Sequence, residues 1–151
     1  MDLTINIDGA SKGNPGAAGI GVVVSDSEGR VLKEVSEYIG QTTNNVAEYT
    51  ALLRGLEEAL ALGARSVRVL TDSELLARQV VGIYKVKAPH LLQLNEMALA
   101  LMKKFRTASV SHVRRELNAA ADKLASSAAI RKASIRFEPD EPEGDEQGTL
   151  F

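Results

Sequence analysis

The first forty residues alternate apolar and polar positions with the period of a β-strand. Residues 3–9 follow this alternation, residues 19–24 form an apolar run that contains glycine, and residues 31–39 predict a third strand. A glycine-rich loop at residues 9–16 and a turn at residues 25–29 separate the three segments. Because the connections are short, the pattern favours an antiparallel meander.

The chain after residue 42 changes to the longer period of amphipathic helices, interrupted by two short strands. Leucine and alanine recur at helical spacing over residues 46–62, and Gly63 is expected to end that helix. The elements that follow are a strand at 67–70, a helix from Asp72 or Ser73 to about Val81, a helix at 91–105, a strand at 108–113, and a helix that Asn118 caps and that ends near Arg131. A meander followed by strand–helix alternation predicts an α/β domain, a mixed sheet covered by helices.

The composition is that of a folded domain, which narrows the classes of function. The chain has 151 residues, of which 44% are hydrophobic and 25% charged, and it contains no cysteine. These values exclude a wholly disordered or collagen-like chain, and the missing cysteines exclude disulfides and thiolate metal sites. We see no secretory signal at the start and no apolar run long enough to span a bilayer, so we expect a cytoplasmic protein without a membrane partner.

Charge is distributed unevenly and divides the chain into two parts. Residues 138–151 hold six of the 20 acidic residues and none of the 18 basic ones, so residues 1–137 are net basic. Prolines and a glycine interrupt the acidic stretch, a composition typical of flexible segments. We therefore predict one folded domain at residues 1–137 and an acidic, flexible tail at residues 138–151.

Four acidic residues stand at the ends of predicted elements, where ligands of α/β sheets bind. Asp8 ends the first strand and Asp72 ends the fourth. Glu48 lies in the first turn of the first helix, and Asp122 lies in the first turn of the last helix. Because strand ends and helix starts meet at one edge of such a sheet, the four carboxylates are expected to come together there.

Each acid by itself also has a purely structural explanation. Asp8 followed by glycine is typical of a turn, Glu48 stands at capping-box spacing from Asn45, Asp72 is a possible cap, and Asp122 would favour the positive end of its helix. As a group, four converging carboxylates would repel one another unless a cation joined them. All-oxygen ligation favours Mg²⁺ or Mn²⁺, and two such ions about 4 Å apart activate water and stabilise the leaving oxygen in phosphodiester cleavage.

The motifs around these acids resemble those of a known family. The chain has D-G-x-x-x-G-N-P-G at residues 8–16, T-N-N-x-x-E at residues 43–48, T-D-S at residues 71–73 and N-x-x-x-D-x-L-A at residues 118–125. In this order, over residues 1–132, they resemble type 1 ribonuclease H. The resemblance implies the ribonuclease H fold, with a five-stranded mixed sheet flanked by helices. It also implies endonucleolytic hydrolysis of the RNA strand of RNA–DNA hybrids, leaving 5′-phosphate and 3′-hydroxyl ends.

The resemblance also implies roles for individual residues. The ligands of two Mg²⁺ ions, with Mn²⁺ as the alternative, would be Asp8 as the bridging ligand, Glu48, Asp72 and Asp122. The positions expected to contact the substrate are Gly9, Ser11, Asn14, Asn44, Asn45 and Ser73. Asparagine side chains can reach 2′-hydroxyls in the wide minor groove of a hybrid. For Asn44 and Asn45, helix capping is the competing explanation.

Two features depart from the family pattern. Many relatives carry a histidine in the loop before the last aspartate, whereas His112 is expected to belong to a strand here. We expect Arg115 to substitute in part by pairing with phosphate, although a solvated basic pair of Arg114 and Arg115 explains the sequence equally well. The basic protrusion of some relatives is reduced to Lys85 and Lys87 at residues 82–90. Either the grip on the hybrid is weaker, or these lysines share it with Lys12.

The last five residues suggest a partner. Residues 147–151, Q-G-T-L-F, resemble the Q-x-x-L-F peptide that docks on the bacterial sliding clamp. The alternatives are that Leu150 and Phe151 fold back on the domain, or that the tail is inert. We expect a monomeric enzyme. The other functions left open are additional cleavage of double-stranded RNA, a non-catalytic hybrid-binding module, and an adaptor that acts through its tail.

Overall fold

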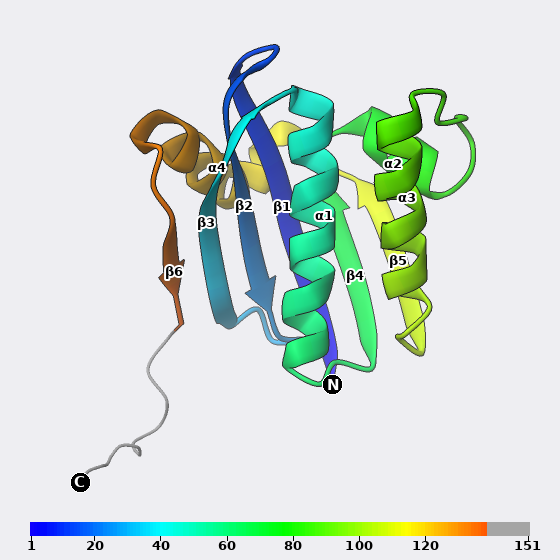
Figure 1. The fold of residues 1–151 in the computed structure, drawn as a ribbon. Coiled ribbons are helices and arrows are strands. Elements are labelled where there is room, and N and C mark those ends of the chain that lie inside the picture. The colour runs from blue at the N-terminus through cyan, green and yellow to red at the C-terminus, as the bar shows by residue number, and fades with distance from the viewer. Residues whose placement is uncertain (139–151) are drawn as a thin grey trace, which may run out of the picture.

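A mixed β-sheet of six strands forms the centre of the molecule (Figure 1). The computed structural model of the protein describes residues 1–138. The strands lie in the order β5-β4-β1-β2-β3-β6. Their bounds are Asp2–Gly13 for β1, Gly16–Ser25 for β2, Val31–Thr42 for β3, Ser66–Thr71 for β4, Thr107–His112 for β5 and Ile135–Phe137 for β6.

The pairing of the strands confirms the predicted mixed sheet and corrects its size. β1, β2 and β3 form the antiparallel meander, and β4 and β5 join it in parallel beside β1. The expected five strands become six because β6 pairs antiparallel with residues 34–36 of β3. Three residues are too few to show a strand period in the sequence, so β6 was not predicted.

The helices cover both faces of the sheet (Figure 1). α1 (Asn44–Ala61), α2 (Glu74–Val80) and α3 (Pro89–Met102) lie on one side, and α4 (Ala119–Arg131) lies on the other. A 3₁₀ helix, η1 (Arg115–Asn118), leads into α4. α1 begins two residues before the predicted start because Thr43, the N-cap, accepts a hydrogen bond from the amide of Val46. Gly63, with φ of +80°, follows its end as expected.

The glycine-rich segment at residues 9–16 is strand rather than loop. β1 and β2 continue to Gly13 and Gly16, which pair with each other, so that only Asn14 and Pro15 form the turn. Glycines in this hairpin allow close packing of backbone against helices. A Cβ atom at Gly19 would lie 2.5 Å from the carbonyl oxygen of Ala125 in α4. Helix α4 therefore sits close to β2, which brings its first turn near β1.

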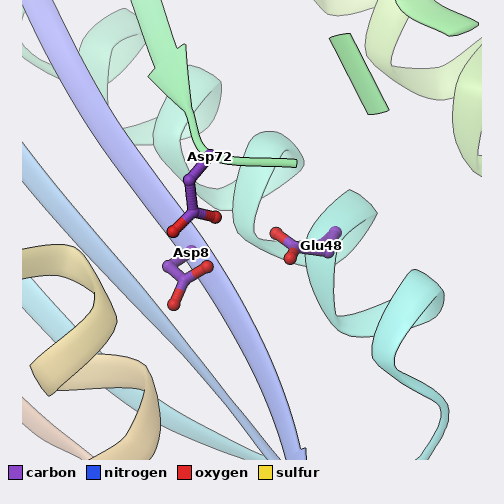
Figure 2. A group of neighbouring side chains, drawn as sticks. All are labelled: Asp8, Glu48 and Asp72. Carbon is purple, nitrogen blue, oxygen red and sulfur yellow. The ribbon is translucent and has the colours of Figure 1, made fainter. Parts of the chain in front are cut away.

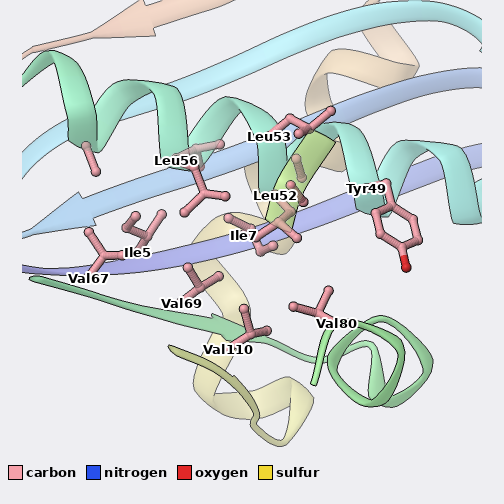
Figure 3. Close-up of a cluster of buried hydrophobic side chains, with 14 of the residues drawn as sticks. Ile5, Ile7, Tyr49, Leu52, Leu53, Leu56, Val67, Val69, Val80 and Val110 are labelled. Carbon is pink, nitrogen blue, oxygen red and sulfur yellow. The ribbon is translucent and has the colours of Figure 1, made fainter. Parts of the chain in front are cut away.

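The core lies between α1 and the sheet (Figure 3). Leu52 and Leu56 of α1 are fully buried against Ile5 and Ile7 of β1 and Val69 of β4. Burying side chains of this size contributes about 1.5–3 kcal/mol each relative to exposure. This packing fixes α1 across β1, which carries Asp8, and β4, which is followed directly by Asp72. In residues 1–138, no helix is both long and apolar enough to span a bilayer.

Candidate active site

Three of the four predicted carboxylates come together where the pairing of β1 with β4 ends (Figure 2). Asp8 lies in β1, Glu48 in α1, and Asp72 directly after β4. Each offers one carboxylate oxygen within 4.8 Å of the others. Asp8 and Glu48 are buried, whereas Asp72 is half-buried at the opening. Residues separated by up to 64 positions in the chain thus form a single acidic site.

Gly9 sets the distance between β1 and α1 at this site. A Cβ atom on Gly9 would lie 2.5 Å from the amide nitrogen of Glu48, a contact that no side chain tolerates. The amide of Gly9 also donates a hydrogen bond of 3.2 Å to Oε1 of Glu48. Glu48 therefore serves no capping box with Asn45, because its carboxylate points to β1 and Thr43 caps the helix. The structural explanation for Glu48 is wrong.

The structural explanations for Asp8 and Asp72 are also wrong. Asp8 lies within β1, paired with Gly21 of β2, so it is not in a turn, and the prediction that it ends the first strand is wrong because β1 continues to Gly13. Asp72 does not cap α2, because Ser73 is the N-cap and its Oγ accepts a hydrogen bond of 3.1 Å from the amide of Leu76. The carboxylate of Asp72 is thereby left to face the site.

The fourth acid, Asp122, approaches Asp8 from the opposite face of the sheet. It lies in the first turn of α4, with a side chain that is 36% exposed. Asn118, which is 1% exposed, is the N-cap residue of α4 as predicted, but its side chain makes no capping hydrogen bond. Its Nδ2 donates a hydrogen bond of 2.8 Å to the carbonyl oxygen of Ile7, and its Oδ1 accepts a hydrogen bond of 3.0 Å from Nδ2 of Asn6. These bonds attach the start of α4 to β1 beside Asp8.

Burial and mutual repulsion make ionisation of this group unfavourable. The pKa of Asp8 is raised to about 9. Burial is the largest cause, followed by the charge of Glu48, a hydrogen bond with Asp122 and the charge of Asp72. Burial and the charge of Asp72 raise the pKa of Glu48 to about 8, against the lowering effect of the Gly9 amide. A divalent cation would remove this penalty. The donor set, carboxylate oxygens without thiolate or imidazole, fits Mg²⁺ or Mn²⁺.

Arg115 and His112 lie on opposite sides of a short linker. His112 is the last residue of β5, which confirms that it belongs to a strand. Arg115 opens η1 rather than lying in an open loop, because residues 115–118 form one 3₁₀ turn. Its Nη2 lies 3.9 Å from Oδ1 of Asp122, and its side chain is 78% exposed. Arg115 is therefore next to the acidic site and accessible to a ligand.

Four of the predicted substrate-contacting residues lie at the β1–β2 hairpin and the start of α1. Asn44 and Asn45 are exposed, and since Thr43 caps α1 the capping explanation for them is wrong. Asn14 at the hairpin tip accepts a hydrogen bond of 3.0 Å from the amide of Asn44, which joins the hairpin to α1. Ser11 donates 2.9 Å to the carbonyl of Thr42. Both contacts hold the hairpin beside the start of α1.

The lysines expected to share the grip on a substrate have different surroundings. Lys85 and Lys87 are exposed between α2 and α3. Lys12 donates a hydrogen bond of 2.9 Å to Oγ of Ser126 in α4. In the same connection between α2 and α3, Tyr84 lies under the guanidinium of Arg78, 5.5 Å from the ring centroid to Cζ. Lys12 is thus attached to α4, and the two other lysines are free to meet a ligand.

A buried polar network beside Glu48 was not predicted from the sequence. Tyr49 is 2% exposed. Its hydroxyl donates a hydrogen bond of 2.8 Å to Oε1 of Gln79 in α2 and accepts a hydrogen bond of 3.2 Å from Nδ2 of Asn95 in α3. A single oxygen therefore connects α1, α2 and α3. A narrow crevice between α1 and α2 runs past this network and is lined by Asn45, Glu48, Tyr49, Ser73, Leu75, Leu76 and Gln79. A tyrosine among the apolar positions of a helix is typical of an ordinary core residue, so no sequence pattern indicates its hydrogen bonds to the two other helices.

Comparison with known proteins shows the family. A family model described as Reverse transcriptase-like matches residues 6–128. The bifunctional protein Rv2228c of Mycobacterium tuberculosis is 46% identical over 143 residues, which are 92% of this chain and 39% of that protein. The chain thus spans well under half the length of this curated relative.

Solved structures give the same result. The crystal structure of RNase H1 from Halobacterium salinarum matches with a TM-score of 0.84 and 36% identity, over 88% of this chain and all of that one. LC11-RNase H1, solved in complex with an RNA/DNA hybrid, matches with a TM-score of 0.81 and 43% identity, over 86% and 98% of the two chains. The sequence motifs, the order of the strands and these matches agree, and the chain belongs to the type 1 ribonuclease H family.

Proposed function

We propose that this protein is an endoribonuclease that hydrolyses the RNA strand of RNA–DNA hybrids and leaves 5′-phosphate and 3′-hydroxyl ends. The observation that carries the proposal is the convergence of Asp8, Glu48 and Asp72 within 4.8 Å, at a site where their negative charges lack a counterion among the described residues. The relatives named ribonuclease H support it, and so does the hybrid bound to LC11-RNase H1.

The carboxylates are proposed to hold two Mg²⁺ ions, or Mn²⁺ in their place. Asp8, at the centre of the group, would bridge them, with Glu48, Asp72 and Asp122 as the other ligands. When bound, the ions supply an activated water and stabilise the leaving oxygen of a phosphodiester. The chain's own contribution is to hold these oxygens in place through Gly9 and Asn118 before a ligand arrives.

The predicted substrate-contacting residues are proposed to select the hybrid. Asn44 and Asn45 present free amide side chains that can bond 2′-hydroxyls in the minor groove. The hydroxyl of Ser73 accepts from Leu76 and keeps its own proton to donate. Ser11 already donates to Thr42, so it can only accept a further bond. Gly9 and Asn14 would contribute backbone and amide groups at the hairpin.

Arg115 is proposed to bind a substrate phosphate in the role that a loop histidine has in other members. Its exposure and its position 3.9 Å from Asp122 support this role. If Arg115→Ala loses little activity and His112→Ala loses much more, the role belongs to His112 and not to Arg115. Because Arg115 and the reduced basic protrusion depart from the usual pattern, we propose additional cleavage of double-stranded RNA as the second candidate activity. Parallel assays on both duplexes separate the two.

The organisation of the whole chain is proposed as a catalytic domain at residues 1–137 and an acidic tail at residues 138–151, in a monomeric cytoplasmic protein. The clamp-binding peptide at residues 147–151 lies outside the described residues. Deleting those five residues and measuring retention on immobilised sliding clamp tests that partner. If the parent and the truncated protein are retained equally, residues 147–151 do not bind the clamp.

The decisive experiment is cleavage of a labelled RNA–DNA hybrid in Mg²⁺ or Mn²⁺ by the parent chain and by Asp8→Asn. This substitution keeps the shape of the side chain and removes the charge that a cation requires. We expect a loss of at least 10³-fold, with binding of the hybrid retained. Equal cleavage by the two proteins would reject the metal site, and binding without cleavage by the parent would favour the non-catalytic binding module.

A further inference from the structure

The sheet face opposite α1 is covered over only part of its width. Helix α4 packs on β1, β2 and β3 (Figure 1). The same face of β4 and β5 meets solvent, since Arg68, Thr107, Ser109 and Ser111 are all exposed. An open face at the edge of a sheet is a candidate surface for a ligand.

The strand register makes the amino-terminal part of this open face polar. Thr4 of β1 pairs with Arg68 of β4, which pairs with Ser109 of β5, and two residues earlier Ser66 pairs with Thr107. Side chains of paired residues point to the same side of a sheet. We call this surface the β4–β5 face and define it by Thr4, Arg65, Ser66, Arg68, Arg106, Thr107 and Ser109.

Two adjoining clefts hollow the β4–β5 face. The first, of about 550 Å³, is lined by residues that include Arg65 and Arg106, and the second, of about 360 Å³, by residues that include Arg68. The residues common to both are Asp2, Ser27, Ser66 and Thr107. The clefts are therefore parts of one depression that runs from the amino-terminal ends of β1, β4 and β5 along the strands.

The charges in this depression favour an anion. Within residues 1–138, none of the three arginines forms an ion pair. Two carboxylates line the clefts, Asp2 and Asp26. Asp26 is already paired, because its Oδ2 lies 3.7 Å from Nε of Arg30 and its Oδ1 accepts hydrogen bonds of 2.9 Å from the amides of Glu28 and Arg30. Three guanidinium groups thus face one unpaired carboxylate, among hydroxyls that can donate to phosphate oxygens.

We propose that the β4–β5 face binds the phosphate backbone of single-stranded nucleic acid. No aromatic residue lines either cleft, so the contacts are to phosphate and sugar rather than to stacked bases. A flexible single strand can follow a depression along the strands, whereas a rigid duplex cannot bend into it. Along β4 the face ends at Arg68, which lies four residues before Asp72 and about 13 Å from it at about 3.3 Å per residue. It is therefore separate from the acidic site.

The test measures binding of fluorescein-labelled dT12 by anisotropy in EDTA, where no hydrolysis occurs. The variant Arg65→Gln/Arg68→Gln/Arg106→Gln removes the three guanidinium groups. The control Arg131→Gln/Lys132→Gln removes two exposed charges at the end of α4. We expect the first variant to lose at least 10-fold in affinity, and the slope of log K against log salt to become shallower by about 2, at about 0.7 per phosphate contact. The control should change the affinity less than threefold.

Three outcomes would overturn the proposal: an equal loss in the control, an unchanged affinity in the first variant, or an equal loss of binding to a DNA duplex. Thermal melts of both variants verify that they fold. The measurement needs no metal and no cleavage, so it succeeds or fails independently of the proposed nuclease activity. As a second readout, the first variant should cleave a short, fully paired hybrid within twofold of the parent rate.

Discussion

Nδ2 of Asn118 donates a 2.8 Å hydrogen bond to the carbonyl oxygen of Ile7, the residue that precedes Asp8. Asn118 lies four positions before Asp122, so this bond joins the segments that carry two of the four acids. The side chain is 1% exposed and also accepts from Asn6. The position of Asp122 beside Asp8 therefore depends on a residue that is not itself acidic.

Replacing Asn118 tests whether its hydrogen bond to β1 holds Asp122 in position, without changing any of the four acids. We expect Asn118→Ala to lose about 1–3 kcal/mol of stability, because the Ile7 carbonyl is left without its buried donor. Hybrid cleavage should fall at least 10-fold in kcat with KM within threefold, since the proposed substrate-contacting residues are unaffected. Asn6→Ala, which leaves the bond to Ile7 intact, is the control and should retain most activity. A parallel fall in both variants would contradict this assignment.

The acidic site should make the metal-free protein less stable as pH rises. The pKa of Asp8 is raised to about 9 and that of Glu48 to about 8, both well above their values in an unfolded chain. Below about pH 4 both groups carry protons in either state and the full stability is present. Above it, the unfolded chain releases protons that the folded chain retains. The free energy of unfolding in EDTA should therefore decline from about pH 4 to about pH 9.

Asp8→Asn should reverse this decline in part. Without the charge at position 8, metal-free protein at pH 7 should gain about 1–3 kcal/mol, at about 1.4 kcal/mol per pKa unit relieved, and the gain should vanish near pH 4. Millimolar Mg²⁺ should raise the melting temperature of the parent and leave that of the variant nearly unchanged. Thermal melts across pH, with and without Mg²⁺, provide the measurement. A variant less stable than the parent at pH 7 in EDTA would count against the electrostatic account.

Gly9→Ala tests the close approach of β1 and α1. The added methyl group would contact the backbone at Ala47 and Glu48, and neither strand nor helix can move without disturbing the core. We expect a loss of about 1–3 kcal/mol and at least 10²-fold lower cleavage, since Glu48 is displaced. Gly29→Ala is the control, because a Cβ there meets no atom within 4 Å and its φ of +85° gives only local strain. It should lose stability without losing cleavage.

An ion cluster attaches β6 to the end of α1. Glu58 is 7% exposed, accepts from Lys33 at 2.9 Å and bonds Arg136 of β6. Burial alone would raise the pKa of Glu58, but the bonds from Arg136 and Lys33 outweigh it and lower the pKa. The cluster therefore stabilises the fold above the ordinary carboxyl pKa of 4.5 and loses its effect as pH falls through the lowered value.

Glu58→Gln should accordingly cost about 1–3 kcal/mol at pH 7 and much less below pH 4. Chemical denaturation at the two pH values measures the difference. Glu57→Gln, whose partner Arg54 also bonds Glu37, is the exposed control and should change stability by less than 0.5 kcal/mol or so. A pH-independent loss in Glu58→Gln would show that packing, not charge, carries the effect. Hybrid cleavage should stay near the parent value, because the cluster lies at the far end of α1.

Local patterns along the chain determined the class of fold and the identity of the acids. Alternation with period two and helical spacing are properties of neighbouring residues, so the meander, α1 and the order of elements were predictable. The position of Glu48 at the start of α1 and of Asp72 after β4 was equally local, whereas β1 continues five residues past Asp8. The convergence of the acids was expected because parallel strands end at one edge of a sheet.

Tertiary structure decided what depends on residues distant in the chain. β6 forms because residues 34–36 of β3 lie at an edge of the sheet and pair with it. The glycine-rich segment is strand because its two halves pair with each other as parts of β1 and β2. The side chain of Asn118 bonds β1 instead of capping its helix because Ile7 presents a buried carbonyl to it. Likewise Tyr49 joins three helices through one oxygen, and Arg65, Arg68 and Arg106 line adjoining clefts because β1, β4 and β5 lie side by side. A buried polar group takes whichever partner the fold brings within reach, and no local pattern encodes that partner.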